Sequence, residues 1–253
     1  MRFGVCCNPA DIARMEAIGF DYVEGNATQL FRMEEEAFER VREQVLACSI
    51  RVEAFNCLFP AERKILLDPA AEAAYLDALF PRMTALGGRL VVFGSGYARA
   101  CPEGMDKQDG QRRMAALCRL LAQKAATHGM QAVIEPLNPA ETNMVNTQEQ
   151  ARQLAGEVGH PAFGLLADFY HMSAVGDSAA EVGTDGSLLR HAHIAAPGTR
   201  SCPSPSDGVD YRPFFDGLAG AGYQGRISYE GGGADDGQYR QLLAFLKEQT
   251  TSR

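Results

Sequence analysis

The sequence lacks long apolar runs, cysteine pairs spaced as Cys-x-x-Cys, and any Pro-, Gly- or Ser-rich linker within its 253 residues. No stretch approaches the ~18 consecutive apolar residues that a membrane helix needs. Residues 1–15 carry one Arg and too short an apolar run for a signal peptide. We therefore expect a cytoplasmic protein without a membrane segment. The missing linker favours a single domain over residues 1–253.

Positive charge is also scarce. The 24 Lys and Arg residues stand against 32 Asp and Glu residues, which gives a formal net charge of −8. Such a surface repels phosphate backbones and anionic lipid, so we expect neither nucleic acid nor a membrane as partner. The seven cysteines are odd in number, which argues against a disulfide scaffold or thiolate zinc site and predicts buried, reduced thiols.

Short apolar runs alternate with longer amphipathic segments along the whole chain. The runs are nearly continuous in apolar character, as in parallel strands that are covered on both faces. They predict eight strands, at Arg2–Cys6, Tyr22–Glu24, Arg51–Asn56, Leu90–Phe93, Ala132–Glu135, Phe163–Ala167, His191–Ile194 and Ile227–Tyr229. The amphipathic segments predict helices, among them Met33–Cys48, Ala70–Leu86, Gln111–His128 and Gln148–Val158. This order, over about 250 residues, predicts an α/β protein with a single (β/α)8 TIM barrel.

Residues typical of helix ends agree with this alternation of strands and helices. Glycines follow several amphipathic stretches, where a helix C-terminus favours them: Gly19, Gly87, Gly88, Gly129 and Gly222. Thr147 and Asp210 are candidate caps at helix starts. A doubly wound sheet is the rival architecture. It normally has a Gly-rich phosphate turn after its first strand, and the residues after Val5 have no such turn.

Four consecutive predicted strands end in side chains of the types that bind metal ions in proteins: Glu135, Asp168, His193 and Glu230. In a βα barrel the C-terminal ends of the strands converge on one mouth, where the chemistry takes place. Three carboxylates packed there without a cation would repel one another and lose hydration. Three oxygen donors and one imidazole suit Mn²⁺, Mg²⁺ or Co²⁺ better than a sulfur-rich zinc site. We therefore predict a divalent metal ion.

Further polar side chains follow these strand ends. Glu141 lies six residues after Glu135, His171 three after Asp168, and Arg200 seven after His193. His191 shares a strand with His193 at a spacing of two, so both imidazoles are expected on one face. We predict a second group of side chains around the metal ligands.

The fragments Ile-Glu-Pro-Leu-Asn around Glu135, Asp-Phe-Tyr-His-Met from Asp168 and His-Ala-His before Ile194 resemble the xylose-isomerase-like TIM barrel superfamily. This sugar phosphate isomerase/epimerase group includes ketose 3-epimerases, hydroxypyruvate isomerase and inosose dehydratase. The resemblance follows the strand order over the whole chain. It is most specific from Val133 to Gly231.

The resemblance implies a role for each site residue. In ketose 3-epimerases a metal ion, here Mn²⁺ by preference, is held by residues that correspond to Glu135, Asp168, His193 and Glu230. Glu141 and His171 match substrate contacts of that group, and His191 is expected beside them. Arg200 is one residue out of register with the family's Arg. The family often has an acidic residue shortly after the two histidines, where this chain has Ala195-Ala196-Pro197.

The implied reaction is the epimerisation or isomerisation of a ketose or related hydroxy-ketone through a cis-enediolate. Glu135 and Glu230 are the expected acid/base pair, one on each face of the reacting carbon. The ketose 3-epimerase type is favoured. A hydroxypyruvate isomerase, which has Gln where His193 stands, and a keto-inositol isomerase or dehydratase share the first half of the mechanism and remain alternatives.

Two other function classes remain. A metal nuclease of the endonuclease IV type would need a multi-zinc site with more histidines than the five present, and a basic groove. A non-catalytic sugar-binding barrel would need no metal. Gly94-Ser95-Gly96 could cradle a phosphate or simply turn the chain. By resemblance alone, we expect a homodimer or homotetramer.

Overall fold

The computed structural model describes residues 1–184 and 186–251. Eight parallel strands form a closed barrel in chain order, with β8 pairing back onto β1. The strands are β1 (Arg2–Cys6), β2 (Tyr22–Asn26), β3 (Val52–Asn56), β4 (Leu90–Phe93), β5 (Gln131–Ile134), β6 (Phe163–Asp168), β7 (Leu189–Ile194) and β8 (Arg226–Tyr229). The predicted TIM barrel is confirmed.

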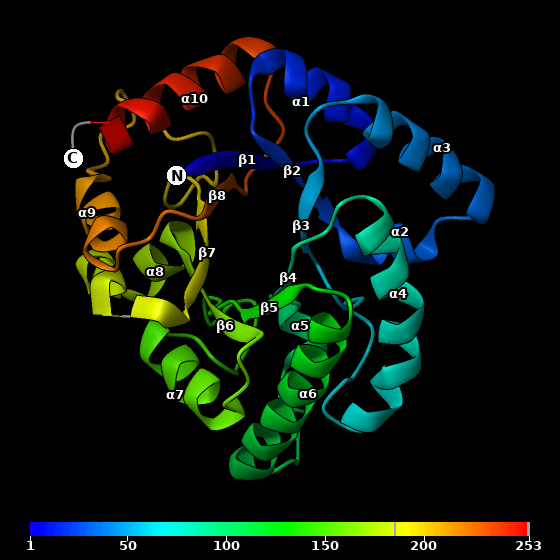
Figure 1. Cartoon of the computed structure of the whole chain (residues 1–253). Helices are drawn as coiled ribbons and strands as arrows, with labels where there is room; N and C mark the ends of the chain where they lie inside the picture. Colours follow the sequence, from blue (N-terminus) through cyan, green and yellow to red (C-terminus); the bar gives the residue numbers. More distant parts are fainter. Residues whose placement is uncertain (185, 252–253) are drawn as a thin grey trace.

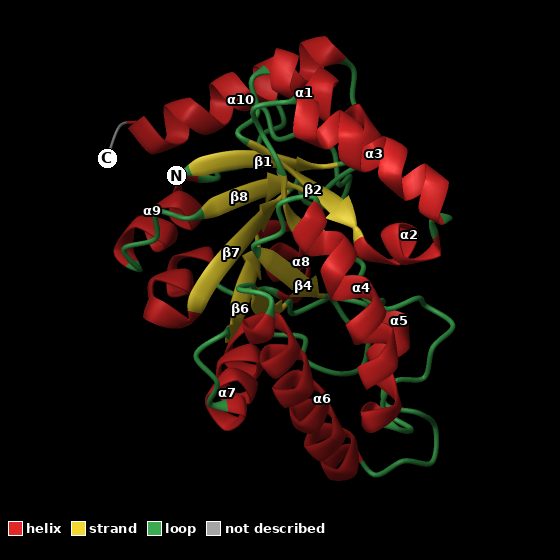
Figure 2. Cartoon of the chain, turned by 45° about the vertical axis from the view of Figure 1, so that its right-hand side comes forward, coloured by secondary structure: helices red, strands yellow, loops and turns green. Residues whose placement is uncertain are grey.

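Helices surround this barrel (Figure 1). The α-helices are α1 (Ile12–Ile18), α2 (Ala27–Arg32), α3 (Glu35–Ala47), α4 (Ala73–Ala85), α5 (Gly96–Arg99), α6 (Lys107–Thr127), α7 (Gln148–Val158), α8 (Phe169–Val175), α9 (Arg212–Gly220) and α10 (Asp236–Thr251). Short 3-10 helices are η1 (Pro9–Asp11), η2 (Pro69–Glu72), η3 (Ala179–Thr184) and η4 (Gly186–Leu188). Figure 2 shows the short helices α2 and α5 at the end toward which the strands point.

The helix boundaries follow local hydrogen bonds. Helix α7 has the predicted bounds because the Thr147 side chain accepts from the backbone N–H of Gln150. Helix α6 begins four residues before the predicted Gln111, since Asp106 caps it by accepting from two backbone N–H groups. The cap predicted at Asp210 is wrong by one residue. Helix α9 begins at Arg212, and Asp210 accepts from the Arg212 backbone N–H without being the residue before the helix.

Two predicted helices begin later than expected. In the segment Met33–Cys48, Met33 is the residue that follows the last turn of the short helix α2, and α3 begins only at Glu35. The segment from Ala70 opens as the 3-10 helix η2, and α4 begins only at Ala73. The predicted stops hold at four glycines with positive φ, namely Gly19, Gly87, Gly129 and Gly222.

Apolar side chains fill two layers. The larger core lies between strands and helices, and a smaller cluster inside the barrel contains Tyr22, Ala54, Leu90, Val92, Val133 and Leu166. The barrel is therefore a packed core rather than a pore. Within residues 1–184 and 186–251, no helix has both the length and the apolar character needed to cross a bilayer.

All seven cysteines lie among the described residues and are free thiols. Cys48, Cys101 and Cys118 are buried as predicted. The prediction of burial is wrong for Cys57, which is exposed at the end of β3, and for three half-buried thiols, Cys6, Cys7 and Cys202.

The N-terminal end of the barrel carries a complete ion-pair cluster. Glu53 of β3 accepts from Arg2 of β1 at 2.6 Å and from Arg226 of β8 at 2.7 Å. Burial raises the pKa of Glu53, but the two guanidinium groups outweigh it and hold the pKa below its usual value. Two cations therefore neutralise one carboxylate at this end.

Candidate active site

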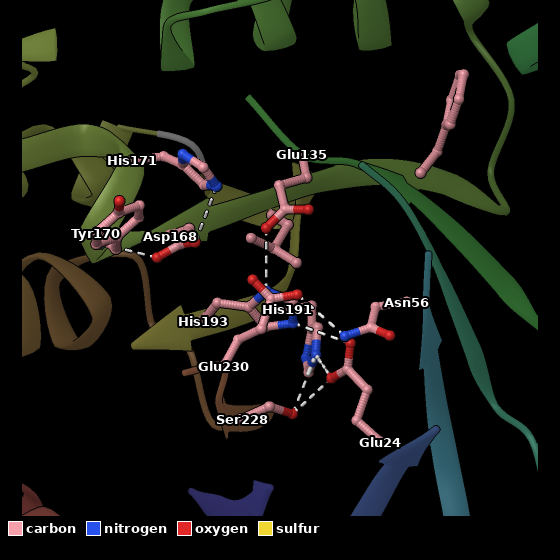
Figure 3. A network of polar contacts seen from close by, with 12 residues as sticks. Glu24, Asn56, Glu135, Asp168, Tyr170, His171, His191, His193, Ser228 and Glu230 are labelled. Atoms are coloured by element: carbon pink, nitrogen blue, oxygen red, sulfur yellow. Dashed lines mark hydrogen bonds and ion pairs between the residues drawn. The ribbon is translucent and has the colours of Figure 1, made fainter. Parts of the chain in front are cut away.

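Three carboxylates meet at the C-terminal mouth of the barrel. Asp168 is the last residue of β6, and Glu135 and Glu230 directly follow β5 and β8. Figure 3 shows these side chains pointing toward one another above the barrel core. One ligand atom from each of Glu135, Asp168, His171 and Glu230 lies within 4.8 Å of the others. The sequence prediction that strand ends converge here therefore holds for all three carboxylates.

The deepest of these carboxylates lacks a partner for one oxygen. Asp168 Oδ1 caps α8 by accepting from the Tyr170 backbone N–H at 2.8 Å. Its Oδ2 is buried and has no hydrogen-bond partner among the described residues. Burial and then the neighbouring charge of Glu135 raise the pKa of Asp168 to about 8. Burial and the charge of Glu230 likewise raise the pKa of Glu135.

The imidazole of His193, fully buried on β7, lies between two sets of carboxylates. Its Nδ1 is 3.0 Å from Glu135 Oε1 and 3.7 Å from Glu230 Oε2. Its Nε2 is 3.0 Å from Glu24 Oε1. Burial lowers the pKa of His193, but the charges of Glu24, Glu230 and Glu135 outweigh it and raise the pKa well above its usual value.

His171 faces the carboxylates with Nε2, while its Nδ1 is engaged in a hydrogen bond with the backbone. Its Nδ1 accepts from the backbone N–H of Asn138 at 3.1 Å, so this nitrogen carries no proton. The proton of the neutral ring is therefore on Nε2, which lies 3.6 Å from Asp168 Oδ2. Burial lowers the pKa of His171 to about 3, and the ring is neutral at pH 7. His171 thus presents an N–H donor to the site, whereas His193 turns Nδ1 toward the carboxylates.

Glu24 is a site residue that the sequence analysis missed. It is fully buried on β2, and it accepts from Ser228 Oγ at 2.6 Å and lies 2.8 Å from His191 Nε2. Burial raises its pKa, but the two histidines outweigh this and hold the pKa of Glu24 far below its usual value. His191 is thus in a layer below His193, and Figure 3 shows Glu24 beneath both imidazoles.

Glu230 and Glu141 are linked by one arginine. Arg200 donates to Glu230 Oε2 at 2.6 Å and to Glu141 Oε1 at 3.4 Å. Its guanidinium carbon lies 4.7 Å from the centroid of the Tyr170 ring. Burial lowers the pKa of Arg200, but Glu230 and further carboxylates raise it above its usual value, so the group stays charged. The predicted site residue Arg200 therefore reaches the mouth despite its shifted place in the sequence.

Two asparagines complete the polar contacts. Asn56, at the end of β3, donates to Glu230 Oε1 at 3.0 Å. Asn138 donates to Glu141 Oε1 at 3.1 Å besides its contact with His171. Sequence reasoning missed both residues. A signal existed for Asn56, because it ends a strand as the carboxylates do, and for Glu24, because it is the one charged residue in the buried strand Tyr22–Asn26.

A cavity of about 460 Å³ opens above this cluster. Glu135, Glu141, Arg200 and Glu230 line it, together with residues of the loop after β3. Its lining holds four carboxylates and two guanidinium groups. A second cavity of about 330 Å³ lies outside the barrel between α6 and α7, and none of the strand-end carboxylates line it.

The donor set fits a divalent metal ion. An unpartnered oxygen of Asp168 and two further carboxylates face one another within ligand distance, and a cation between them would remove their repulsion. Of the two imidazoles, His193 is the better fourth ligand, because His171 Nδ1 faces a backbone N–H and its Nε2 carries the proton.

Comparison with known proteins agrees with the barrel fold described above. The family model for the xylose isomerase-like TIM barrel matches residues 12–249. A 3-dehydro-D-guloside 4-epimerase of Escherichia coli is 37% identical over 145 residues, which are 55% of this chain and 54% of that protein. A ketose 3-epimerase of Arthrobacter globiformis is 31% identical over 111 residues, 44% of this chain and 38% of that one. These two matches span about half or less of each relative's length.

Solved structures share the fold over nearly the whole chain. A 3-keto-D-glucoside 4-epimerase from E. coli superposes with a TM-score of 0.80 at 23% identity, covering 98% of this chain and 99% of that one. A D-psicose 3-epimerase from Clostridium cellulolyticum H10, solved with D-tagatose, superposes with a TM-score of 0.84 at 21% identity, covering 99% of both chains.

Proposed function

Because the chain belongs to the xylose isomerase-like TIM barrel family, we propose that it is a divalent-metal-dependent sugar epimerase. Its substrate is a ketose or a related keto-sugar, and its reaction inverts a carbon next to the carbonyl. One observation carries this proposal: Glu135 and Glu230 each bring a carboxylate oxygen to one point of the cavity, within 4.8 Å of each other. Epimerisation needs two acid/base groups that flank one carbon.

The chain's own residues account for the proton transfers. Glu135 takes the proton from the carbon beside the carbonyl, and the electron pair of the broken C–H bond moves onto the carbonyl oxygen to give a cis-enediolate. Glu230 takes up a proton from water and delivers it to the opposite face, the carbonyl re-forms, and Glu135 then releases its proton to water. Arg200 and Asn56 hold the two oxygens of Glu230, which fixes the direction from which that proton arrives.

Four side chains would hold the metal ion: Glu135, Asp168, His193 and Glu230. When bound, the ion, Mn²⁺ by preference, supplies Lewis-acid stabilisation of the negative charge on the substrate oxygens. His171 and Glu141 lie at the edge of this group. The N–H of His171 and the carboxylate of Glu141 are a donor and an acceptor for substrate hydroxyls.

The same geometry favours an uncharged sugar over a sugar phosphate. A Cβ on Gly94 would lie 2.4 Å from Glu135 Oε2, and one on Gly96 would lie 2.6 Å from the Glu141 carbonyl oxygen. These glycines therefore make room for the acidic residues, and a phosphate in the same turn would meet the charge of Glu135. Of the two arginines that line the cavity, Arg32 pairs with Glu62 and Arg200 pairs with Glu230.

A second candidate substrate is a keto-glycoside. The 37% identity to the E. coli 3-dehydro-D-guloside 4-epimerase is higher than that to the Arthrobacter ketose 3-epimerase, at 31%. Both candidates share proton abstraction beside a ketone. They differ in the carbon that is inverted and in whether a second group is attached to the reacting sugar.

Proton exchange tests the proposal. Mn²⁺-loaded protein is incubated in D₂O with free ketoses, 3-keto-glycosides, hydroxypyruvate and keto-inositols, and the C–H signals are followed by NMR. We expect deuterium to enter a ketose or keto-glycoside beside its carbonyl, with an epimer as product. Glu135→Gln and Glu230→Gln should lower the exchange rate by about 10²–10⁴, while the exposed-site control Glu36→Gln should not.

The product then separates the remaining alternatives. A dehydrated keto-inositol or isomerised hydroxypyruvate would replace the epimerase assignment by one of those two reactions. Metal-loaded protein that exchanges no proton of any of these substrates would contradict the proposal. Stable sugar binding without exchange and without metal would favour the non-catalytic barrel.

A further inference from the structure

Among residues 1–184 and 186–251, Glu24 is the one fully buried carboxylate of the barrel interior that the proposed reaction does not use. It lies below the carboxylates of the mouth and faces the opposite side of the His193 ring (Figure 3). Three donors point at its two oxygens: Ser228 Oγ at 2.6 Å and His191 Nε2 at 2.8 Å contact Oε2, and His193 Nε2 at 3.0 Å contacts Oε1.

The direction of each hydrogen bond follows from the chemistry of the groups. A carboxylate only accepts, so the nitrogen of His193 that faces Glu24 must carry a proton. Ser228 donates its hydroxyl proton to Glu24 and therefore accepts from Tyr22 Oη, which lies 2.8 Å away. Glu24 is held in place by Ser228 and His191, and Oε1 is left for His193 alone.

We propose that Glu24 is a positioning residue that keeps a proton on Nε2 of His193, so that Nδ1, which faces the mouth, is the nitrogen that would give its lone pair to a bound ion. A ligating imidazole commonly donates its other N–H to a carboxylate, and removal of that partner typically weakens metal binding by 10–100-fold. This inference rests on the proposed function in one respect, since it takes His193 as a metal ligand.

Without metal, both nitrogens of His193 lie 3.0 Å from a carboxylate oxygen, Nδ1 from that of Glu135 and Nε2 from that of Glu24, so the ring carries a proton on each. A bound ion at the mouth would take the place of the proton on Nδ1. If the ring lost the Nε2 proton instead, the lone pair of Nε2 would face the Glu24 carboxylate, two acceptors 3.0 Å apart in a fully buried site. A buried acceptor without a donor costs about 1–3 kcal/mol. Glu24→Gln removes this constraint, because an amide presents both an acceptor and a donor and so permits either tautomer.

Metal titration and imidazole NMR together test the proposal. Mn²⁺ is titrated into metal-free wild-type protein, Glu24→Gln and Tyr22→Phe by calorimetry. We expect the Kd to rise 10–100-fold in Glu24→Gln and to stay unchanged in Tyr22→Phe, which removes a buried hydroxyl of the same network but leaves Glu24 and His193 in contact. Two-bond ¹H–¹⁵N spectra of the wild-type protein, metal-free and Zn²⁺-loaded, should show a proton on Nε2 of His193 in both states.

The outcomes separate this inference from the proposed function. An unprotonated Nε2 of His193, or a folded Glu24→Gln variant with wild-type metal affinity, would overturn the role of Glu24. A wild-type protein that binds no metal would overturn the proposed function instead. The Zn²⁺-loaded wild-type spectrum tests the role of Glu24 even if Glu24→Gln does not fold: a proton on Nε2 and none on Nδ1 would support it, and the reverse would overturn it.

Discussion

The two ends of the barrel differ in how their buried carboxylates are neutralised. At the N-terminal end, two guanidinium groups surround the single carboxylate of Glu53, and all three groups have partners. At the C-terminal mouth, the carboxylates of Glu135, Asp168, Glu141 and Glu230 share one arginine as ion-pair partner among the described residues, and Arg200 pairs with Glu141 and Glu230 only. The first arrangement is neutralised by the chain itself. The second leaves negative charge for something outside the chain to neutralise.

We expect the ion-pair cluster at the N-terminal end to stabilise the fold and the carboxylates at the C-terminal mouth to serve function. Positive partners hold the pKa of Glu53 below its usual value, whereas burial and repulsion raise the pKa of Asp168 to about 8. A carboxylate with a depressed pKa stabilises the fold at pH 7, and one with a raised pKa costs folding free energy there. In TIM barrels the C-terminal face is also where the active sites lie.

The largest expected effect comes from the same substitution made at each end. Glu135→Gln should lower turnover by about 10²–10⁴ and leave the unfolding free energy of the metal-free protein unchanged or higher, because it removes a repelling charge. Glu53→Gln should leave turnover at the wild-type rate. Turnover is measured by the appearance of epimer, and stability by urea unfolding. Equal loss of turnover in both variants would remove the distinction between the two ends.

Metal removal gives the next effect. At a concentration one hundred times its Kd, a bound ion stabilises the folded state by about 2.7 kcal/mol. We expect Mn²⁺ to raise the melting temperature of wild-type and Glu53→Gln protein alike. Asp168→Asn keeps the acceptor that caps α8 but removes the charge, and its melting temperature should no longer respond to Mn²⁺. Thermal unfolding with and without a chelator measures this. An undiminished response in Asp168→Asn would place the ion elsewhere.

Breaking the N-terminal cluster should cost less. Glu53→Gln leaves Arg2 and Arg226 without their shared carboxylate. Because these arginines are partly exposed, we expect a loss of about 1 kcal/mol in unfolding free energy. The urea midpoint of the metal-free protein reports it. A variant as stable as the wild type would mean that solvent already screens this cluster.

The smallest effect is the pH dependence of that loss. The pKa of Glu53 in the folded protein is below its usual value of 4.5, so its contribution is fully present above about pH 4.5. It disappears as the pH falls through the lowered pKa. The difference in urea midpoint between wild type and Glu53→Gln should therefore shrink below pH 4.5. A difference that grows with acid would contradict the assigned direction of the pKa.

The sequence predicted the fold because periodicity and strand ends are local signals. The eight strands, and the carboxylates Glu135, Asp168 and Glu230 at their ends, were recognisable without a structure. Helix starts were less predictable. The cap at Asp106 precedes the first apolar residues of its helix, so the pattern alone placed the start four residues late.

The partners of the site residues were not predictable, because they depend on contacts between distant strands. Glu24 and His193 are 169 residues apart in the chain and meet only when β2 and β7 close into the barrel. The tautomer of His171 likewise depends on the backbone N–H of Asn138, which lies 33 residues away in the chain. A cytoplasmic location and a homodimer or homotetramer remain predictions from the sequence and the resemblance.

Metal content tests the central claim most directly. The claim is that the surplus negative charge at the C-terminal mouth binds one divalent ion. Elemental analysis of the purified protein, followed by calorimetric titration of Mn²⁺ into the metal-free chain, should give one ion per chain in the wild type and a large loss of affinity in Asp168→Asn. A wild-type chain that binds no divalent ion, or one whose affinity survives Asp168→Asn unchanged, would contradict the account.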